Sequence, residues 1–247
     1  MIALEFSNVG VNYGPVQALE QASFRLEAGV LCGLIGVNGS GKSTLFKAAM
    51  GVEPLSCGSI TVLGQSPERA RQSGLVSYMP QSERVDWTFP VSVREVVAMG
   101  RYRGLGITRR LRAQDRAEVD VALERVGLAQ LGKRQIGELS GGQKKRVFMA
   151  RALAQKAQLF LLDEPFAGVD TASEALLIEV LKELRDDGAT VLLATHGVEG
   201  LGAYADRAIL LKNRVLLHDS PQLVLRPENL ALAFGMDSAV HERGERS

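Results

Sequence analysis

The alternation of apolar and polar residues predicts an antiparallel β part at the start of the chain. Apolar positions alternate loosely with polar ones over residues 4–11 and again over residues 22–26, as in half-exposed strands. The turns of this part are expected at residues 10–13 and 27–29, where glycine occurs. Residues 30–35 are apolar throughout, which predicts a central strand covered on both faces.

The middle of the chain is expected to be mainly helical, from residue 81 to about residue 142. Capping-box patterns at residues 92–95 and 115–118 predict two helices, which end near Met99 and Gly127. Basic residues between these helices are expected to form a solvated connecting face. They are Arg101, Arg103, Arg109, Arg110 and Arg112.

Further strand patterns lie on both sides of the helical stretch, at residues 59–64, 75–79, 158–162 and 189–194. A helix is predicted over residues 171–188, again from a capping box. This β–α–β alternation calls for a parallel sheet with right-handed crossovers. A hairpin that turns at residues 212–213 is expected near the end of the chain, followed by a short helix from Pro221.

Composition narrows the class of protein. The 247 residues are 46% hydrophobic with a net charge of +1, so a full core can form and general nucleic-acid binding is not indicated. No signal peptide is visible, and the apolar runs are far shorter than the roughly 20 residues of a membrane span. The only cysteines, Cys32 and Cys57, make no disulfide framework, and a reducing compartment fits best. His196, His218 and His241 are scattered and predict no metal cluster.

Residues 36–44 form a glycine-rich segment between a predicted strand and a predicted helix. Glycines let successive backbone N–H groups face phosphate oxygens, and the helix adds the positive end of its dipole. Lys42 would bring a charge to the β- and γ-phosphates, and Ser43 a hydroxyl to Mg²⁺. The predicted nucleotide-binding residues of this phosphate loop are Gly36, Asn38, Gly39, Ser40, Gly41, Lys42, Ser43 and Thr44.

An apolar strand at residues 159–162 ends in two carboxylates, Asp163 and Glu164. Parallel sheets place their chemistry at the carboxyl ends of strands, where the phosphate loop also lies. Asp163 is therefore expected to reach Mg²⁺ through a bound water, and Glu164 to polarise the water that attacks the γ-phosphate.

Ser140, Gly141, Gly142 and Gln143 precede another helix and suggest a second anion-binding site. An ordinary N-cap is the alternative interpretation. One nucleotide should not need two phosphate-binding segments from one chain, but a second copy of the chain could explain both.

The order of these features resembles an ATP-binding-cassette (ABC) ATPase: the phosphate loop, Gln81, residues 139–143, Asp163–Glu164 and His196. The resemblance covers nearly the whole chain. It implies ATP and Mg²⁺ as cofactors, with Mg²⁺ near Ser43, Gln81 and Asp163. It also implies a head-to-tail dimer in which Ser140, Gly141, Gly142 and Gln143 of one subunit close over the ATP held by the other.

The same resemblance assigns further roles. Tyr13 should stack on adenine, and Gln81 should sense Mg²⁺ and the attacking water. His196 should hydrogen-bond the γ-phosphate and act with Glu164 and Gln81 as the catalytic set. Asp170 should contact the partner subunit. Gly197 departs from the family pattern, which usually has an acidic residue after the histidine.

Fold and domain expectations follow from these motifs. We expect an α/β fold with a P-loop NTPase core, a mixed sheet with an antiparallel β lobe, and a helical insertion subdomain. One ABC ATPase domain is predicted over residues 1–235, with its core at residues 1–81 and 149–235 and the insertion at about 82–148. Residues 236–247 are expected to be a frayed tail.

Residues 79–102 and 165–170 are similar to the manganese and iron importer branch of the family, with zinc importers close by. Trp87, Phe89 and Pro90 would suit a groove wall for a partner helix, although packing within the insertion is an equal alternative for Trp87.

The predicted function is ATP hydrolysis that energises import of manganese or iron through separate membrane subunits. A second copy of the chain, the membrane permease subunits and an extracytoplasmic metal-binding protein are the expected partners, and nucleic acid is not. The chain would act at the cytoplasmic face of the inner (plasma) membrane. Alternatives are an importer ATPase for zinc or a metal chelate, and a soluble ABC protein that binds ribosomes or DNA. A small-molecule P-loop kinase is a further option, against which residues 139–143 argue.

Overall fold

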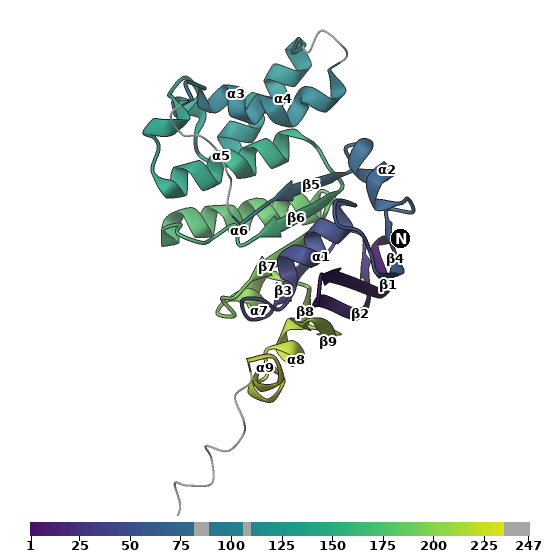
Figure 1. Cartoon of the computed structure of the whole chain (residues 1–247). Helices are drawn as coiled ribbons and strands as arrows, with labels where there is room; N and C mark the ends of the chain where they lie inside the picture. Colours follow the sequence, from purple (N-terminus) through teal and green to yellow (C-terminus); the bar gives the residue numbers. More distant parts are fainter. Residues whose placement is uncertain (82–88, 106–109, 235–247) are drawn as a thin grey trace, which may run out of the picture.

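The computed structural model describes residues 1–81, 89–105 and 110–234. Two sheets form the centre of the molecule, and a group of helices covers one end (Figure 1). Trp87 and Arg109 lie outside the described residues, as does the whole predicted tail of residues 236–247.

The smaller sheet is antiparallel, with strand order β2-β1-β4. Its strands are β1 (Ile2–Tyr13), β2 (Val16–Glu27) and β4 (Cys57–Val62). The predicted turn at residues 10–13 is wrong, because these residues remain in β1 and Tyr13 pairs with Val16. The chain turns at residues 14–15 instead, where Gly14 adopts a left-handed φ of 57°.

The larger sheet has the order β5-β6-β7-β3-β8-β9 and is parallel except for β9. Its strands are β3 (Leu31–Ile35), β5 (Val76–Met79), β6 (Leu159–Asp163), β7 (Thr190–Thr195), β8 (Arg207–Lys212) and β9 (Arg214–Asp219). Every residue of β3 is buried, as the continuous apolar run predicted. The parallel order brings the carboxyl ends of β3, β6 and β7 to one edge.

Two groups of helices accompany the sheets. Those of the core are α1 (Lys42–Ala49), α2 (Pro67–Gln72), α6 (Thr171–Asp186), α7 (Leu201–Tyr204), α8 (Pro221–Val224) and α9 (Pro227–Phe234). The helical end consists of α3 (Val93–Ala98), η1 (Met99–Gly104), α4 (Ala113–Arg125), η2 (Ala129–Leu131), η3 (Ile136–Glu138) and α5 (Gly141–Ala154). None of the helices in the described ranges has the length and apolarity needed to span a membrane.

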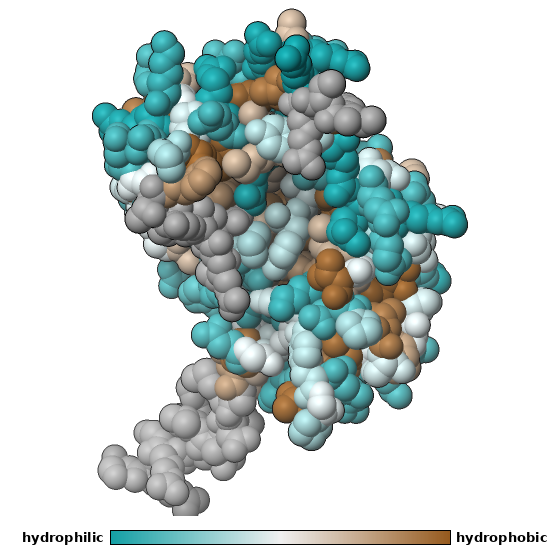
Figure 2. Space-filling model, turned by 45° about the horizontal axis from the view of Figure 1, so that its top comes forward, coloured by the Kyte–Doolittle hydropathy of each residue, from teal (hydrophilic) through white to brown (hydrophobic). Residues whose placement is uncertain are grey.

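Alternate residues of β6 belong to two different hydrophobic cores. Phe160 and Leu162 pack with the helical end and α6, whereas Leu159 and Leu161 pack with α1 and the antiparallel sheet. The fold is thus held together across both faces of the larger sheet. On the face shown in Figure 2, apolar residues lie as separate patches among hydrophilic ones.

Three local predictions in the helical regions need correction. α4 begins at Ala113 rather than at residue 115, because Asp115 is the third helical residue and accepts a hydrogen bond from the Arg112 backbone N–H at 3.0 Å. Asp170, not Thr171, is the N-cap of α6. Arg101 is not simply solvated, since its guanidinium lies 3.0 Å from Asp115 and also bonds a carbonyl of α5.

Candidate functional site

The phosphate loop joins β3 to α1 and requires its glycines. A Cβ on Gly36 would lie 2.4 Å from the carbonyl oxygen of Leu211, and one on Gly41 would lie 2.7 Å from that of Ala18. Gly41 is also left-handed, with φ 97°. By contrast, nothing lies within 4 Å of the position that a Cβ on Gly39 would take. The loop is therefore packed tightly on one side and open on the other, which fits a phosphate group.

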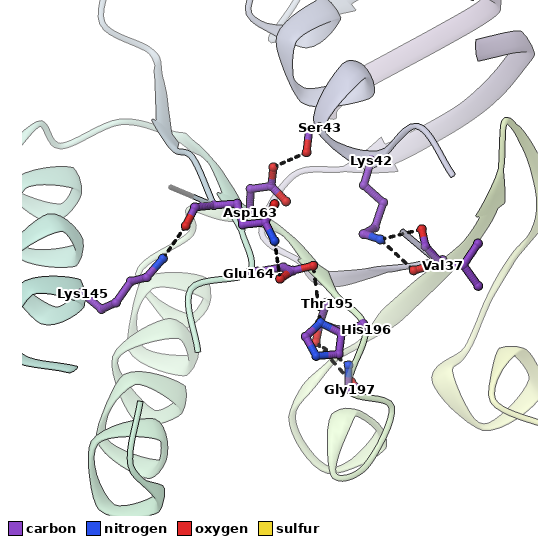
Figure 3. A network of polar contacts seen from close by, with 11 residues as sticks. Val37, Lys42, Ser43, Lys145, Asp163, Glu164, Thr195, His196 and Gly197 are labelled. Atoms are coloured by element: carbon purple, nitrogen blue, oxygen red, sulfur yellow. Dashed lines mark hydrogen bonds and ion pairs between the residues drawn. The ribbon is translucent and has the colours of Figure 1, made fainter. Parts of the chain in front are cut away.

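Lys42 is almost fully buried at the first turn of α1, with 6% of its surface exposed. Its Nζ donates hydrogen bonds to the carbonyl oxygens of Gly36 at 2.7 Å and Val37 at 3.1 Å (Figure 3). Burial lowers the pKa of Lys42, while the charges of Glu164 and Asp163 oppose this shift. Two neutral carbonyl oxygens thus hold the ammonium group next to the phosphate loop. Phosphate oxygens could take the place of these carbonyls as its hydrogen-bond acceptors.

Ser43 and Asp163 face each other across the site. The Ser43 hydroxyl donates to Asp163 Oδ2 at 2.6 Å. Burial raises the pKa of Asp163, partly offset by this hydrogen bond. Mg²⁺ prefers oxygen ligands and often keeps several waters. A hydroxyl beside a buried carboxylate, next to a phosphate cradle, is a donor set that fits this ion.

Glu164 receives contacts from two other strand ends. Its Oε2 accepts a hydrogen bond from Gln81 Nε2 at 2.8 Å, and its Oε1 lies 3.4 Å from His196 Nδ1 (Figure 3). Glu164 itself has a left-handed φ of 51°, a costly conformation for a side chain of this size, and such outliers cluster at functional sites. The predicted catalytic residues Glu164, Gln81 and His196 therefore form one connected group.

A cavity of about 400 Å³ connects these parts. It is lined by Tyr13, Val16, Ala18, Asn38, Gly39, Gly41, Lys42, Ser43, Thr44, Gln81, Asp163, Glu164 and Asn213. Most of the predicted nucleotide and Mg²⁺ residues thus share one cavity with the predicted catalytic Gln81 and Glu164. Val16, Ala18 and Asn213 were not predicted, since their residue types carry no motif.

Lys145 is another residue that the sequence did not indicate. It lies in the second turn of α5, and its Nζ donates to the backbone carbonyl of Gln81 at 2.7 Å (Figure 3). Through Gln81, α5 is therefore connected to the carboxylate of Glu164. The sequence contains no specific signal for this contact. A lysine can donate to any nearby carbonyl oxygen, and the sequence does not show which carbonyl lies near Lys145.

Ser140 lies at the N-cap of α5, outside the residues that line this cavity. Its hydroxyl accepts a hydrogen bond from the Gln143 N–H at 3.2 Å, and its own N–H donates to the Gln143 side chain at 3.0 Å. Asp170 is close by, because its Oδ2 lies 3.6 Å from where a Cβ on Gly142 would be. Ser140, Gly142, Gln143 and Asp170 thus form a second polar group, outside the cavity that the phosphate loop of the same chain lines.

Residues 19–167 match the ABC transporter family, which is more than half of the chain. The chain belongs to this family. Its fold is the ABC ATPase fold with a P-loop core, as predicted, and it is an ATP-binding subunit that hydrolyses ATP.

Relatives of this ABC ATPase cover nearly its full length. It is 46% identical to the manganese transport system ATP-binding protein MntA of Synechocystis, over 94% of this chain and 90% of that protein. It is also 46% identical to the chelated iron transport system membrane protein YfeB of Yersinia pestis, over 94% of this chain and 79% of that protein. The zinc transport system ATP-binding protein TroB of Treponema pallidum is 40% identical over 99% of this chain and 92% of the relative.

A solved structure gives the same picture of the ABC fold. A chain of an inward-facing ABC transporter, assigned to the metal-chelate type, superposes with a TM-score of 0.83 at 30% identity. The match covers 95% of this chain and 90% of the other.

Proposed function

We propose that this ABC ATPase energises the import of manganese or iron through separate membrane subunits. The observation that carries the proposal is the 46% identity, over 94% of the chain, to a manganese transport ATP-binding protein and to a chelated iron transport protein. Lys42, Ser43, Asp163 and Glu164 line one cavity, and this arrangement supports a hydrolytic site in the same chain.

In this proposal the phosphate loop binds the phosphates of ATP and Lys42 neutralises their charge. Ser43 and Asp163, with the amide oxygen of Gln81, would hold Mg²⁺. When bound, this ion neutralises charge on the phosphate oxygens. Tyr13 lies at the rim of the cavity with 42% of its surface exposed, and an exposed ring suits stacking on adenine.

Glu164 is the proposed general base. Its two oxygens contact Gln81 and His196, so both neighbours restrict the orientation of the carboxylate. A water placed between this carboxylate and the terminal phosphate would lose its proton to Glu164 as it attacks. His196 also carries an exposed ring that can donate a hydrogen bond to the same phosphate.

A second copy of the chain is the proposed partner at the nucleotide. Ser140 and Gly142 do not line the cavity of their own chain, yet they open a helix whose N-terminal N–H groups suit a phosphate. Contact with the ATP of another subunit would give them this role. Asp170, held next to Gly142, would lie in the same interface.

Membrane permease subunits are the second proposed partner, which puts this chain at the cytoplasmic face of the inner membrane. A groove of about 600 Å³ lies between β5, η1 and α5 and is lined by both aromatic and basic residues, among them Tyr78, Tyr102 and Arg103. Phe89, 63% exposed, offers a further apolar anchor near the start of the helical end. An amphipathic helix of a permease, with acidic residues on its polar side, would complement such a surface.

The metal itself would be selected by the permease and an extracytoplasmic binding protein. Within the described ranges, this chain has no cluster of three or more histidine, cysteine or carboxylate side chains that could hold a metal ion. Uptake of radiolabelled manganese, iron and zinc in a strain that lacks this chain tests the proposal. Loss of manganese or iron uptake is expected, restored by the unmodified gene. Selective loss of zinc uptake would favour the zinc alternative, and unchanged uptake of all three would refute metal import.

A further inference from the structure

We propose that Asn213 is a positioning residue that sets the distance between two walls of the nucleotide cavity. One wall is the phosphate loop. The other, here called the nucleoside wall, consists of Tyr13, Val16 and Ala18 at the paired ends of β1 and β2. The inference rests on the proposed nucleotide site, and it assigns a role to a residue that carries no motif.

Asn213 forms the tight turn between β8 and β9 and lines the same cavity. Its φ is 57°, a left-handed conformation that asparagine and glycine tolerate better than other residues. Its backbone N–H donates to the carbonyl of Ser40 in the phosphate loop at 2.8 Å. The backbone of this turn is thus attached directly to the phosphate wall.

The side chain of Asn213 points to the opposite wall. Its Nδ2 donates to the carbonyl oxygens of Gln17 and Ala18, each at 3.2 Å. In addition, its backbone carbonyl accepts a hydrogen bond from the Glu20 N–H at 2.7 Å. One residue therefore connects the loop to β2 through four hydrogen bonds.

The position of Ala18 is what makes this connection matter for the nucleotide. Its carbonyl is the group that a Cβ on Gly41 would approach to 2.7 Å, so β2 and the loop already pack at their limit there. Movement of β2 away from the loop would widen the cavity between Ala18 and Gly41. A ligand that spans both walls would lose contact with one of them.

This arrangement separates two kinds of ligand. A ligand made only of phosphates needs the loop, which the backbone N–H of Asn213 supports whatever the side chain. ATP extends from the loop to the nucleoside wall, so it also needs the side-chain hydrogen bonds. Removal of the amide should therefore weaken ATP binding more than the binding of inorganic tripolyphosphate.

Asn213→Gly is the appropriate variant, because glycine keeps the left-handed turn and the backbone hydrogen bonds. Binding of Mg²⁺–ATP and of Mg²⁺–tripolyphosphate would be measured by calorimetry on the full chain, together with the melting temperature. We expect the Kd for ATP to rise about three- to tenfold, as for the loss of one or two neutral hydrogen bonds. The Kd for tripolyphosphate should stay within about twofold. Arg214→Ala, an exposed change in the same hairpin, is the matched control and should alter neither ligand.

Asn213→Asp keeps the shape of the side chain but replaces the donor with a carboxylate that faces two carbonyl oxygens. This variant should weaken the binding of both ligands, and it should weaken ATP binding more than Asn213→Gly does. Unchanged ATP affinity in Asn213→Gly, or an equal loss for both ligands, would overturn the inference while leaving the nucleotide site intact. If the unmodified chain bound neither ligand, the nucleotide site would be wrong and the inference would fail with it.

Discussion

The amide nitrogen of Gln81 donates a hydrogen bond to the carboxylate of Glu164 at 2.8 Å. Gln81 follows β5, whereas Glu164 follows β6, and the two strands are neighbours in the parallel sheet. The sequence places these residues far apart, and the sheet brings their side chains together at its carboxyl edge. If Glu164 is the general base that we propose, hydrolysis should depend on the charge of its carboxylate more than on the shape of its side chain.

Glu164→Gln tests that dependence. The amide keeps the size of the side chain but cannot take a proton from water, so hydrolysis should fall by about 10²–10⁴-fold while ATP still binds. With ATP trapped, the dimer should persist in size-exclusion chromatography. A variant that stays monomeric with ATP and releases phosphate at the normal rate would contradict the assigned role.

Lys42→Ala should nearly abolish hydrolysis, because it removes the buried ammonium from the phosphate cradle. Charge-assisted hydrogen bonds contribute about 1.5–3 kcal/mol each, so two of them predict a loss on the order of a hundredfold or more. Lys47→Ala is the control, since Lys47 is an exposed lysine on the same helix. If both variants released phosphate at the same rate, the proposed role of Lys42 in binding the phosphates would be refuted.

Ser140→Arg should block hydrolysis but leave ATP binding to the isolated chain nearly unchanged, because Ser140 lies outside the cavity of its own chain. A mixture with Lys42→Ala offers a sharper measurement. Each mixed dimer contains one site with both elements intact, so part of the activity should return. No recovery at any ratio would argue against shared sites.

Lys145→Met should lower kcat and leave the KM for ATP unchanged, because Lys145 bonds the backbone carbonyl of Gln81 and does not line the nucleotide cavity. A loss of about three- to tenfold is expected, smaller than for the buried Lys42, because this hydrogen bond is exposed to solvent and acts only through Gln81. Lys145→Arg should restore much of the rate, since the guanidinium can still donate to the Gln81 carbonyl. A rise in KM with constant kcat would instead indicate a nucleotide contact.

Asp163→Asn should make the ligand-free chain more stable near neutral pH. Burial raises the pKa of Asp163, so the folded chain holds this proton more tightly than the unfolded chain does, and ionisation costs stability as the pH rises. The neutral amide avoids that cost. The melting temperature should therefore exceed that of the unmodified chain at pH 7 and approach it near pH 3, below the ordinary range of the carboxyl. Mg²⁺-dependent hydrolysis should be lost. A melting temperature at pH 7 below that of the unmodified chain would contradict the predicted direction of the stability change.

Local patterns were enough to predict the main elements of the candidate site. The phosphate loop, the strand that ends in Asp163 and the capping box at Ser92 each depend on a few consecutive residues, and the structure has all three. Continuous apolar runs likewise identified the central strands, because burial on both faces leaves no other composition. The contacts among Gln81, Glu164 and His196 could only be inferred through the family resemblance.

Long-range contacts explain what the sequence did not predict. Arg101 was expected in solvent, but Asp115 and a carbonyl of α5 hold it, and neither is close in sequence. Lys145 and Asn213 act through backbone carbonyls, which leave no trace in residue type. The predicted boundary at residue 148 falls inside α5, which runs without a break from residue 141 to residue 154.

The length of α5 turns a small motion at one end into a larger one at the other. Gln155, at its C-terminal end, donates hydrogen bonds to the carbonyls of Val76, the first residue of β5, and of Gly74 in the turn before it, and Ser140 caps the opposite end. At 1.5 Å per residue the helix is a lever of about 21 Å, so a tilt of roughly 5° about Gln155 would displace Ser140 by about 2 Å. That distance is enough to make or break a hydrogen bond to a phosphate oxygen. Lys145 lies between the two ends and is bound to Gln81, so such a tilt would also change the distance between α5 and the residue that contacts Glu164.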